Sequence, residues 1–368
     1  MSDVNGLSTK RIVIFAGGTG GHVFPALAVA ETLRAAGHHV SWVGTAERIE
    51  ARLVPAAGFE FHCMAQQGLR GNGLLGYVKA PFSLLAAVFK ARRLIRQQQA
   101  DLVLGFGGYT AGPGGVAARL SGVPLLIHEQ NAAPGLTNKL LAKIAQRTLL
   151  GFAAAKDVLS GAQWVGNPVR EQVFSANQDA KRGEQPMRVL VVGGSLGAQV
   201  LNEQVPTALA KWPHSDIKVT HQVGKGRAQE TLARYAQCPS SVRVSVHEFI
   251  DDMAKAYAHH DLIICRAGAL TVAEVAAAGI ASILVPYPHA VDDHQTRNAE
   301  VLVMAHAGVL IPQPKLTAEH LLTTLEELYA VPDKIRDMGA KARSVSQPEA
   351  TAKIVAHCYQ LMNKKAAV

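Results

Sequence analysis

The chain has 368 residues and a mass of 39.0 kDa, about twice the length of an ordinary single domain, so two domains are expected. Hydrophobic residues make up 48% of the chain and charged residues 18%, which excludes a disordered protein because there is ample apolar surface to bury. The four cysteines lie far apart with no CxxC pair. Neither a disulfide framework nor a structural zinc site is therefore predicted, and a reducing cytoplasm fits best.

The net charge of +9 is unevenly distributed along the chain. Residues 1–170 hold 17 Lys and Arg against 8 Asp and Glu, whereas residues 171–368 hold 20 of each class. The basic first half predicts an anionic partner there, which is a membrane, a nucleic acid or a phosphorylated ligand. The first ten residues lack the apolar segment of a signal peptide, and no stretch reaches the roughly 20 apolar residues of a membrane span. We therefore expect neither export nor a transmembrane segment.

Short apolar runs alternate with helical segments throughout the chain. In the first half, strands are predicted at residues 11–16, 39–44, 101–106 and 124–130, and a helix at 25–37, bracketed by a proline and a glycine. The same unit opens again with a strand at 188–192 and a helix from about residue 199, followed by strands at 218–224, 261–268 and 281–288. A terminal helix is predicted from about residue 348. This alternation indicates parallel sheets covered on both faces, in two doubly wound α/β domains.

Three glycine-rich loops follow predicted strands, at residues 17–22, 105–115 and 193–197. A backbone that approaches a phosphate closely needs residues without a Cβ, and such sheets bind ligands at the carboxyl ends of their strands. The dinucleotide fingerprint GxGxxG fails because Val23 stands where it requires glycine, and GxxxxGK[ST] does not occur. These absences disfavour nicotinamide-dependent dehydrogenases and P-loop NTPases. The alternative is that the glycines only make tight turns.

Polar residues that can perform chemistry stand at the carboxyl ends of two predicted strands. His22 opens a helix, where an imidazole can serve as a general base near neutral pH, although it could equally be a cap or a packed side chain. His128, Glu129, Gln130 and Asn131 follow the apolar residues 124–127 and are expected to project into the same crevice.

The segment 266–274 in the second half has the pattern of a nucleotide site. Backbone N–H groups of residues 269–271 at a helix start can hold a phosphate, and Glu274 can accept both hydroxyls of a ribose. The alternative is an ordinary helix start with Thr271 as its cap and Glu274 solvated. The nearby cluster at residues 289–295 contains His and Asp, but a metal site is disfavoured because helix N-termini and arginine can neutralise a pyrophosphate instead.

Eight motifs in order along nearly the whole chain resemble the MurG family. They lie at residues 17–30, 105–115, 128–139, 165–170, 193–198, 248–253, 265–274 and 292–300. Members of that family are bacterial transferases that move N-acetylglucosamine (GlcNAc) from UDP-GlcNAc to lipid I, undecaprenyl-pyrophosphoryl-MurNAc-pentapeptide, to form lipid II for peptidoglycan. The resemblance implies the GT-B arrangement, two Rossmann-like domains facing across a cleft. Residues 1–168 would bind the acceptor and the membrane, residues 169–348 would bind UDP-GlcNAc, and the helix 349–368 would pack back on the first domain.

The resemblance also implies roles for individual residues. On the acceptor side it implicates Thr19, Gly20, Gly21, Gly107, Gly108 and Tyr109. Asn131 and Gln295 would contact the GlcNAc, Arg170 and Ser195 the donor phosphates, and Ile250 the uracil through its backbone. The α-phosphate and ribose would be held by Ala269, Leu270, Thr271, Val272, Ala273 and Glu274. Leu196 departs from the family, whose other members carry glutamine there, so the donor would be held differently at that point.

The reaction implied is a single inverting displacement at the anomeric carbon, without metal or cofactor. It needs a base for the C4 hydroxyl of MurNAc, for which His22 is the first candidate and Glu129 the reserve. Charge on the departing UDP would be stabilised by Arg170 and by the helix that begins near Leu270.

A lipid acceptor requires the enzyme to reach the membrane. Residues 74–85 are apolar with one charge, and residues 89–96 add a mixed basic and apolar surface that includes Lys90, Arg92 and Arg93. This composition is typical of a segment lying on anionic lipid, although core helices with basic rims look similar. The expected location is peripheral, on the cytoplasmic face of the bacterial inner membrane.

Three other classes of protein remain as alternatives. They are another GT-B glycolipid glycosyltransferase, a UDP-GlcNAc 2-epimerase, and a non-catalytic protein that binds nucleotide sugars or anionic lipids. A nucleic-acid partner is not expected, because the basic half shows no interleaved aromatic residues and no recognition motif.

Overall fold

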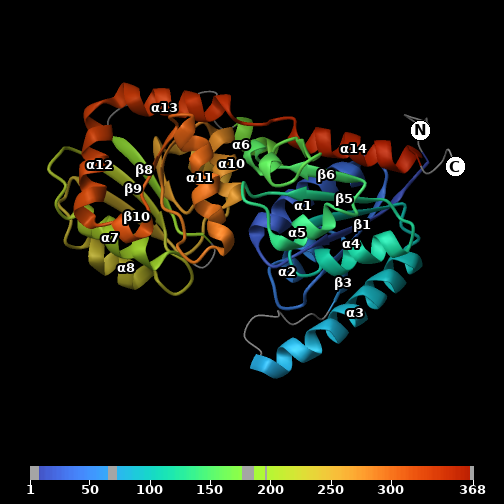
Figure 1. The fold of residues 1–368 in the computed structure, drawn as a ribbon. Helices are drawn as coiled ribbons and strands as arrows, with labels where there is room; N and C mark the ends of the chain where they lie inside the picture. Colours follow the sequence, from blue (N-terminus) through green and yellow to red (C-terminus); the bar gives the residue numbers. More distant parts are fainter. Residues whose placement is uncertain (1–7, 65–72, 176–185, 195–196, 365–368) are drawn as a thin grey trace. The chain divides into compact units, whose positions relative to one another are not determined.

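A computed structural model of the chain describes residues 8–64, 73–175, 186–194 and 197–364 (Figure 1). It divides into two compact units. The first contains the residues up to Pro168 together with those from Glu349 onward, and the second is Val169–Pro348.

The described part of the first unit contains a seven-stranded parallel sheet in the order β3-β2-β1-β4-β5-β6-β7. The strands are β1 (Arg11–Ala16), β2 (His39–Gly44), β3 (Glu60–Cys63), β4 (Leu102–Gly107), β5 (Leu125–Glu129), β6 (Arg147–Leu150) and β7 (Gln163–Trp164). The helices are α1 (Gly20–Ala35), α2 (Glu50–Ala56), α3 (Gly73–Gln97), α4 (Ala111–Leu120), α5 (Leu136–Leu141) and α14 (Ala350–Lys364).

Both faces of this sheet are buried. Ile12 and Ile14 of β1 belong to the hydrophobic core that includes α1 and α14, whereas Val13 and Phe15 belong to the core that includes α3 and α4. Successive side chains of a strand point to opposite faces, so this alternation requires helices on both sides of the sheet. The last helix thus completes the core of the first unit, and Figure 1 shows α14 beside it.

The described part of the second unit contains a six-stranded parallel sheet in the order β10-β9-β8-β11-β12-β13. The strands are β8 (Met187–Val192), β9 (Ile217–Gln222), β10 (Val242–His247), β11 (Leu262–Cys265), β12 (Ala281–Leu284) and β13 (Gly308–Leu310). The helices are α6 (Glu171–Ser175), α7 (Gln199–Leu209), α8 (Ala228–Tyr235), α9 (Met253–His259), α10 (Ala269–Ala278), α11 (His294–Met304), α12 (Ala318–Ala330) and α13 (Pro332–Ser344). The prediction of two Rossmann-like α/β domains is confirmed.

One helix boundary was predicted wrongly. The helix expected at 25–37 begins at Gly20, so Pro25 lies inside α1. Inside a helix a proline removes the hydrogen bond of its own N–H and crowds the carbonyl four residues before it, yet α1 continues through Pro25. His22 therefore lies in the first turn of α1. Among the helices of the described residues, none combines the length and apolarity that crossing a bilayer requires.

Each unit buries a histidine completely. The Nε2 atom of His128 is 2.9 Å from the Gly166 carbonyl oxygen, and Nδ1 of His221 is 2.9 Å from the Tyr235 hydroxyl. Burial disfavours the charged imidazole, and it lowers the pKa of His128 to about 4 and that of His221 to about 3. Both rings are therefore neutral in the folded protein at physiological pH.

These two rings predict a loss of stability in mild acid. Between pH 6.5 and about 4 the unfolded chain binds protons at both positions that the folded chain does not, so the free energy of unfolding falls as the pH falls through this window. At pH 5 the expected loss is about 2 kcal/mol for each histidine. Urea unfolding at pH 7.5 and pH 5.0 measures it, and His221→Gln should reduce the difference for the second unit only. An equal difference in the variant would contradict the assignment.

Candidate functional site

The loops that follow β1 and β4 pack against each other at the carboxyl end of the first sheet. Along this pair of strands Phe15 lies opposite Gly105, but Ala16 lies opposite Gly107, so Phe106 is an extra residue in β4. Such a bulge bends its strand and redirects the residues that follow it. It brings Gly107 and the next residue, Gly108, against the loop after β1.

Side chains would prevent this packing. Gly108 has φ +83°, and a Cβ there would overlap the carbonyl oxygen of Gly17. Gly107 has φ +96°, and a Cβ there would lie 2.9 Å from Nε2 of His22. The two glycines are required both by their left-handed backbone and by the close approach of the neighbouring loop.

His22 is held in the first turn of α1 by the loop that precedes it. Its Nδ1 is 3.2 Å from the carbonyl oxygen of Gly17 and 3.3 Å from the hydroxyl of Thr19. Because a carbonyl oxygen can only accept, the first contact is a hydrogen bond when Nδ1 carries the proton. In that tautomer Nε2 has the lone pair and can receive a proton, as a general base requires.

A buried carboxylate that the sequence analysis missed lies beneath this loop. Glu50, the first residue of α2, is 0% exposed. Its Oε2 accepts the N–H of Gly18 at 3.0 Å, and its Oε1 accepts the N–H and the hydroxyl of Thr45 at 3.1 and 2.7 Å. Gly17 and Gly44 leave it room, since a Cβ at either position would overlap the Glu50 side chain. An acidic residue in the first turn of a helix is common, so the sequence carries no distinguishing signal.

Glu129, at the end of β5, binds its own loop with both carboxylate oxygens. Oε1 accepts the backbone and side-chain N–H groups of Asn131 at 2.9 and 3.1 Å. Oε2 accepts the N–H of Gly135 at 3.2 Å and the amide of Asn138 at 2.8 Å. These four bonds favour a role in shaping the loop that presents Asn131, and the reserve assignment of Glu129 as a base stays a prediction.

Two neighbours of Glu129 were expected in the crevice with it, and all three side chains are buried inside the protein instead. His128 and Gln130 are both buried, and the Gln130 amide donates to the His128 carbonyl oxygen at 3.2 Å. His128 contacts the Gly166 carbonyl, and Asn167 donates to the Gln130 carbonyl oxygen at 3.0 Å. Buried polar groups need partners, and here the backbone of Gly166 serves the His128 ring while the side-chain amide of Asn167 serves the Gln130 carbonyl oxygen.

The second unit carries a helix N-terminus beside a buried acid. Gly268 is the N-cap of α10, and the described residues place no side-chain capping hydrogen bond there, so the alternative interpretation of Thr271 as the cap is wrong. Glu274 is 9% exposed, so its alternative interpretation as a solvated side chain is also wrong. The uncapped N–H groups at this end favour an anion.

Glu274 is held by two residues of the same unit. The Tyr257 hydroxyl donates to Oε2 at 3.0 Å, and Nη2 of Arg170 is 3.8 Å from Oε1. Burial raises the pKa of the Glu274 carboxyl, while Arg170 and the Tyr257 hydroxyl oppose that shift. The structure thus brings together Arg170 and Glu274, two residues that the sequence analysis singled out from segments about a hundred residues apart.

The remaining predicted donor residues also follow strands of the second sheet. Gln295 accepts the N–H groups of Ala267 and Tyr287 at 3.2 and 2.9 Å with its side-chain oxygen, which joins the loops after β11 and β12. Ile250 lies half-buried after β10. Ser195 and Leu196 lie outside the described residues.

On the acceptor side the predicted residues vary in exposure. Thr19 is exposed, Gly20 and Gly21 are half-buried, and Tyr109 is 53% exposed after β4. On α3, Lys90 and Arg93 are exposed and Arg92 is half-buried. In the described chain no group of three or more His, Cys, Asp or Glu side chains is placed to hold a metal ion, including the cluster at 289–295. Metal independence itself stays a prediction.

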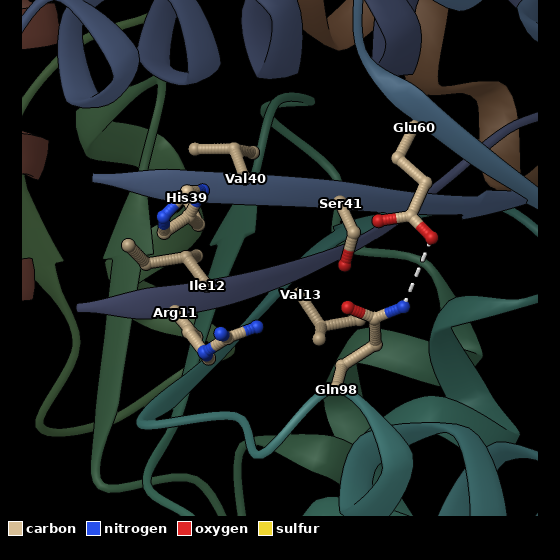
Figure 2. A pocket seen from close by; sticks show the side chains of 8 residues that line it. All are labelled: Arg11, Ile12, Val13, His39, Val40, Ser41, Glu60 and Gln98. Atoms are coloured by element: carbon tan, nitrogen blue, oxygen red, sulfur yellow. Dashed lines mark hydrogen bonds between the residues drawn. The ribbon is translucent and has the colours of Figure 1, made fainter. Parts of the chain in front are cut away.

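A separate pocket lies at the opposite end of the first sheet. Arg11 and His39, the first residues of β1 and β2, line it together with Ser41. Figure 2 shows Gln98 reaching the Glu60 carboxylate across this pocket, with the two side chains 3.1 Å apart. Because ligands of doubly wound folds bind at the carboxyl ends of the strands, this pocket carries no part of the site.

The comparisons with known proteins agree with this geometry. Residues 12–150 match the glycosyltransferase family 28 N-terminal domain, and residues 188–354 match the glycosyltransferase family 28 C-terminal domain. Fold and site therefore define a two-domain glycosyltransferase.

Individual relatives show to which family of glycosyltransferases the chain belongs. A protein of Shewanella woodyi named UDP-N-acetylglucosamine--N-acetylmuramyl-(pentapeptide) pyrophosphoryl-undecaprenol N-acetylglucosamine transferase is 51% identical over 358 residues, which cover 96% of this chain and 98% of that protein. The crystal structure of Acinetobacter baumannii MurG matches with a TM-score of 0.83 and 42% identity, covering 95% of this chain and 99% of that one. The chain belongs to the MurG family within glycosyltransferase family 28. A putative UDP-N-acetylglucosamine 2-epimerase of Listeria monocytogenes, with a TM-score of 0.70 over 97% of this chain and 98% of that one, is 13% identical and shares only the fold.

The interlocked loops predict an unequal cost for two similar substitutions. Gly108→Ala adds a Cβ that overlaps the backbone of Gly17, whereas Gly122→Ala adds one at φ +68° with nothing within 4 Å. Left-handed strain alone should cost Gly122→Ala about 1–2 kcal/mol. Gly108→Ala should cost about 1–3 kcal/mol more, because the overlap adds to the same strain. Urea unfolding of the two variants measures the difference, and equal costs would refute the proposed packing constraint.

Proposed function

We propose that this chain transfers GlcNAc from UDP-GlcNAc to the C4 hydroxyl of MurNAc in lipid I and so forms lipid II for peptidoglycan synthesis. The observation that carries this proposal is the match, at about half identity and over nearly the full length of both chains, to transferases named for that reaction. The site is consistent with it, because each unit presents a set of polar groups at the carboxyl ends of its strands.

The donor belongs to the second unit in this proposal. The N-terminal N–H groups of α10 would hold the α-phosphate, and Glu274 would accept the ribose hydroxyls. Arg170 already lies beside Glu274, at 3.8 Å, from where its guanidinium would meet the diphosphate. With a helix N-terminus and an arginine to stabilise the leaving UDP, the displacement needs no metal ion.

The acceptor belongs to the first unit, where His22 would remove the proton of the C4 hydroxyl. The hydrogen bond from Nδ1 to Gly17 fixes the orientation of the ring, and Nε2 receives the proton. Thr19, Gly20 and Gly21 would border the acceptor pyrophosphate beside the first-turn N–H groups of α1. Inversion follows from a single displacement of α-linked UDP, giving a β-linked product.

The surface of the first unit supports a peripheral membrane location at the cytoplasmic face of the inner membrane. Phe82, Leu85 and Phe89 of α3 are 74%, 54% and 57% exposed, and their spacing places them on one helical stripe. The stripe continues in the exposed Arg93 and Arg96. Exposed leucines extend the apolar surface onto α4, which packs on α3, and α5, which packs on α4. Apolar residues flanked by cations suit a surface of anionic lipid.

A transfer assay tests the function. Purified protein, radiolabelled UDP-GlcNAc and a lipid I analogue should give a β-linked disaccharide product, with undiminished rate in EDTA. UDP binding without transfer would instead favour a non-catalytic nucleotide-sugar protein, and conversion of the donor to UDP-ManNAc would favour an epimerase. Loss of activity in EDTA that Mg²⁺ restores would contradict metal independence.

The assigned base predicts a specific kinetic defect. His22→Ala should lower kcat by about 10²–10⁴-fold, the usual contribution of a general base, while UDP affinity stays unchanged because the donor site lies in the other unit. His39→Ala, which removes an exposed histidine at the far end of the same sheet, is the matched control and should retain full activity. Wild-type kcat in His22→Ala would remove this residue from the role.

The basic end of α3 predicts charge-dependent vesicle binding. Replacing the exposed Lys90, Arg93 and Arg96 with glutamine should weaken binding to phosphatidylglycerol vesicles on the order of a hundredfold, since each cation near an anionic surface contributes about 1 kcal/mol. A sedimentation assay at low and physiological salt measures this. The control replaces three exposed lysines of the second unit, Lys218, Lys225 and Lys334, and so removes the same charge. Equal binding by both triple variants would count against the α3 surface.

A further inference from the structure

One peptide bond connects Glu50 to His22. Glu50 Oε2 accepts the N–H of Gly18 at 3.0 Å, and the carbonyl oxygen of Gly17 accepts Nδ1–H of His22 at 3.2 Å. These two groups belong to the same peptide unit, between Gly17 and Gly18. In a trans peptide the N–H and the C=O point in opposite directions, so the carboxylate and the imidazole lie on its two sides. The three groups form a continuous hydrogen-bonded chain.

We propose that Glu50 is a positioning residue that acts on His22 through the Gly17–Gly18 peptide. A carboxylate that accepts the N–H polarises the amide and makes its carbonyl oxygen a stronger acceptor. That oxygen holds Nδ1–H, keeps the lone pair on Nε2, and stabilises the imidazolium that forms when Nε2 takes a proton. A buried carboxylate performs this function by direct contact in Ser-His-Asp enzymes. The inference rests on the proposed role of His22 as the base.

The burial of Glu50 supports a role beyond loop shape. A fully buried carboxylate is costly and is retained when its hydrogen bonds are satisfied or its charge is used. Here three donors reach the two oxygens, and the glycines at 17 and 44 provide the space. A neutral side chain such as that of serine could accept the same N–H group at a lower desolvation cost. The negative charge of Glu50 is therefore the feature that needs a function.

Several titratable groups lie on the elements around the loop. They are Glu50 on α2, Tyr109 after β4 and Glu129 after β5. Tyr109 is 53% exposed, and Glu129 has both oxygens bound within its own loop. Glu50 is the acid for which the structure gives a hydrogen-bonded path to the imidazole.

Glu50→Gln separates the charge from the shape. The Oε1 position receives two donors from Thr45, so the amide oxygen of glutamine should take that position and its NH₂ group should face the N–H of Gly18. The peptide then loses its acceptor. We expect the titration midpoint of the His22 ring, followed by NMR and assigned by its loss in His22→Gln, to move at least about 0.5 pH unit lower. The acid limb of the kcat profile should move in the same direction, with kcat lowered about tenfold or more.

Thr45→Val is the matched control. It removes the 2.7 Å hydroxyl donor to Oε1 but leaves the Gly18 bond, so it should reduce stability without lowering the His22 midpoint. UDP affinity should be unchanged in both variants. A folded Glu50→Gln protein with a wild-type midpoint and acid limb would overturn the inference and leave Glu50 as a structural clamp.

A measurement on the unaltered chain covers the case in which Glu50→Gln does not fold. The sequence contains only five Gly–Gly peptides, so glycine labelled with ¹³C′ and ¹⁵N isolates five amides, among them that of Gly18. The chemical shift of the Gly18 amide proton should change with pH at the same midpoint as the His22 ring. A Gly18 amide shift that does not change with pH over that range would overturn the inference. If His22→Ala keeps its turnover, the proposed base is wrong, whereas the NMR midpoint still decides whether Glu50 acts on the ring.

Discussion

The Gly17–Gly18 peptide is enclosed on three sides, by the Glu50 carboxylate, by the His22 imidazole and by the backbone of Gly108. Each neighbour approaches so closely that a side chain on the peptide or on the opposing loop would exclude it. The bulge in β4 and the start of α1 have their observed positions because these contacts must be met together. The glycine-rich composition of the loops is thus first a packing requirement, and the space it leaves is where a ligand can approach the backbone.

Different side chains hold the loop before α1 in the first unit and the loop before α10 in the second. In the first unit carboxylates accept backbone N–H groups, as Glu50 does at Gly18 and Glu129 does at Gly135. In the second unit the neutral side chain of Gln295 accepts two backbone N–H groups. In the second turn of helix α10, Glu274 lies beside Arg170. A neutral clamp adds no negative charge beside that helix N-terminus, which suits a doubly charged diphosphate.

The sequence predicted the elements that its apolar pattern defines and missed those decided by tertiary contacts. The strands β1 and β2 agree residue for residue with the apolar runs at 11–16 and 39–44. The strand β7 has two residues, which is too short for an alternating pattern of apolar side chains to be recognised. The start of α1 was missed because Pro25, which lies inside the helix, was taken as its first residue. Polar residues at strand ends were located correctly, but their direction was not predictable. The burial of His128 depends on a carbonyl 38 residues away, and Glu50 meets its partner loop 32 residues before it.

The helix α14 gives the chain an unusual order of assembly. Ile354 and Cys358 belong to the same apolar core as Ile12 and Ile14, so this core of the first unit is completed by residues translated after the second unit. The ribosome synthesises the entire second unit before α14 can pack on one face of the first unit's sheet. Until then the part of that face which α14 covers stays exposed on the nascent polypeptide. Termination before α14 would therefore expose the apolar core of the first unit, although the chain would break off beyond the second.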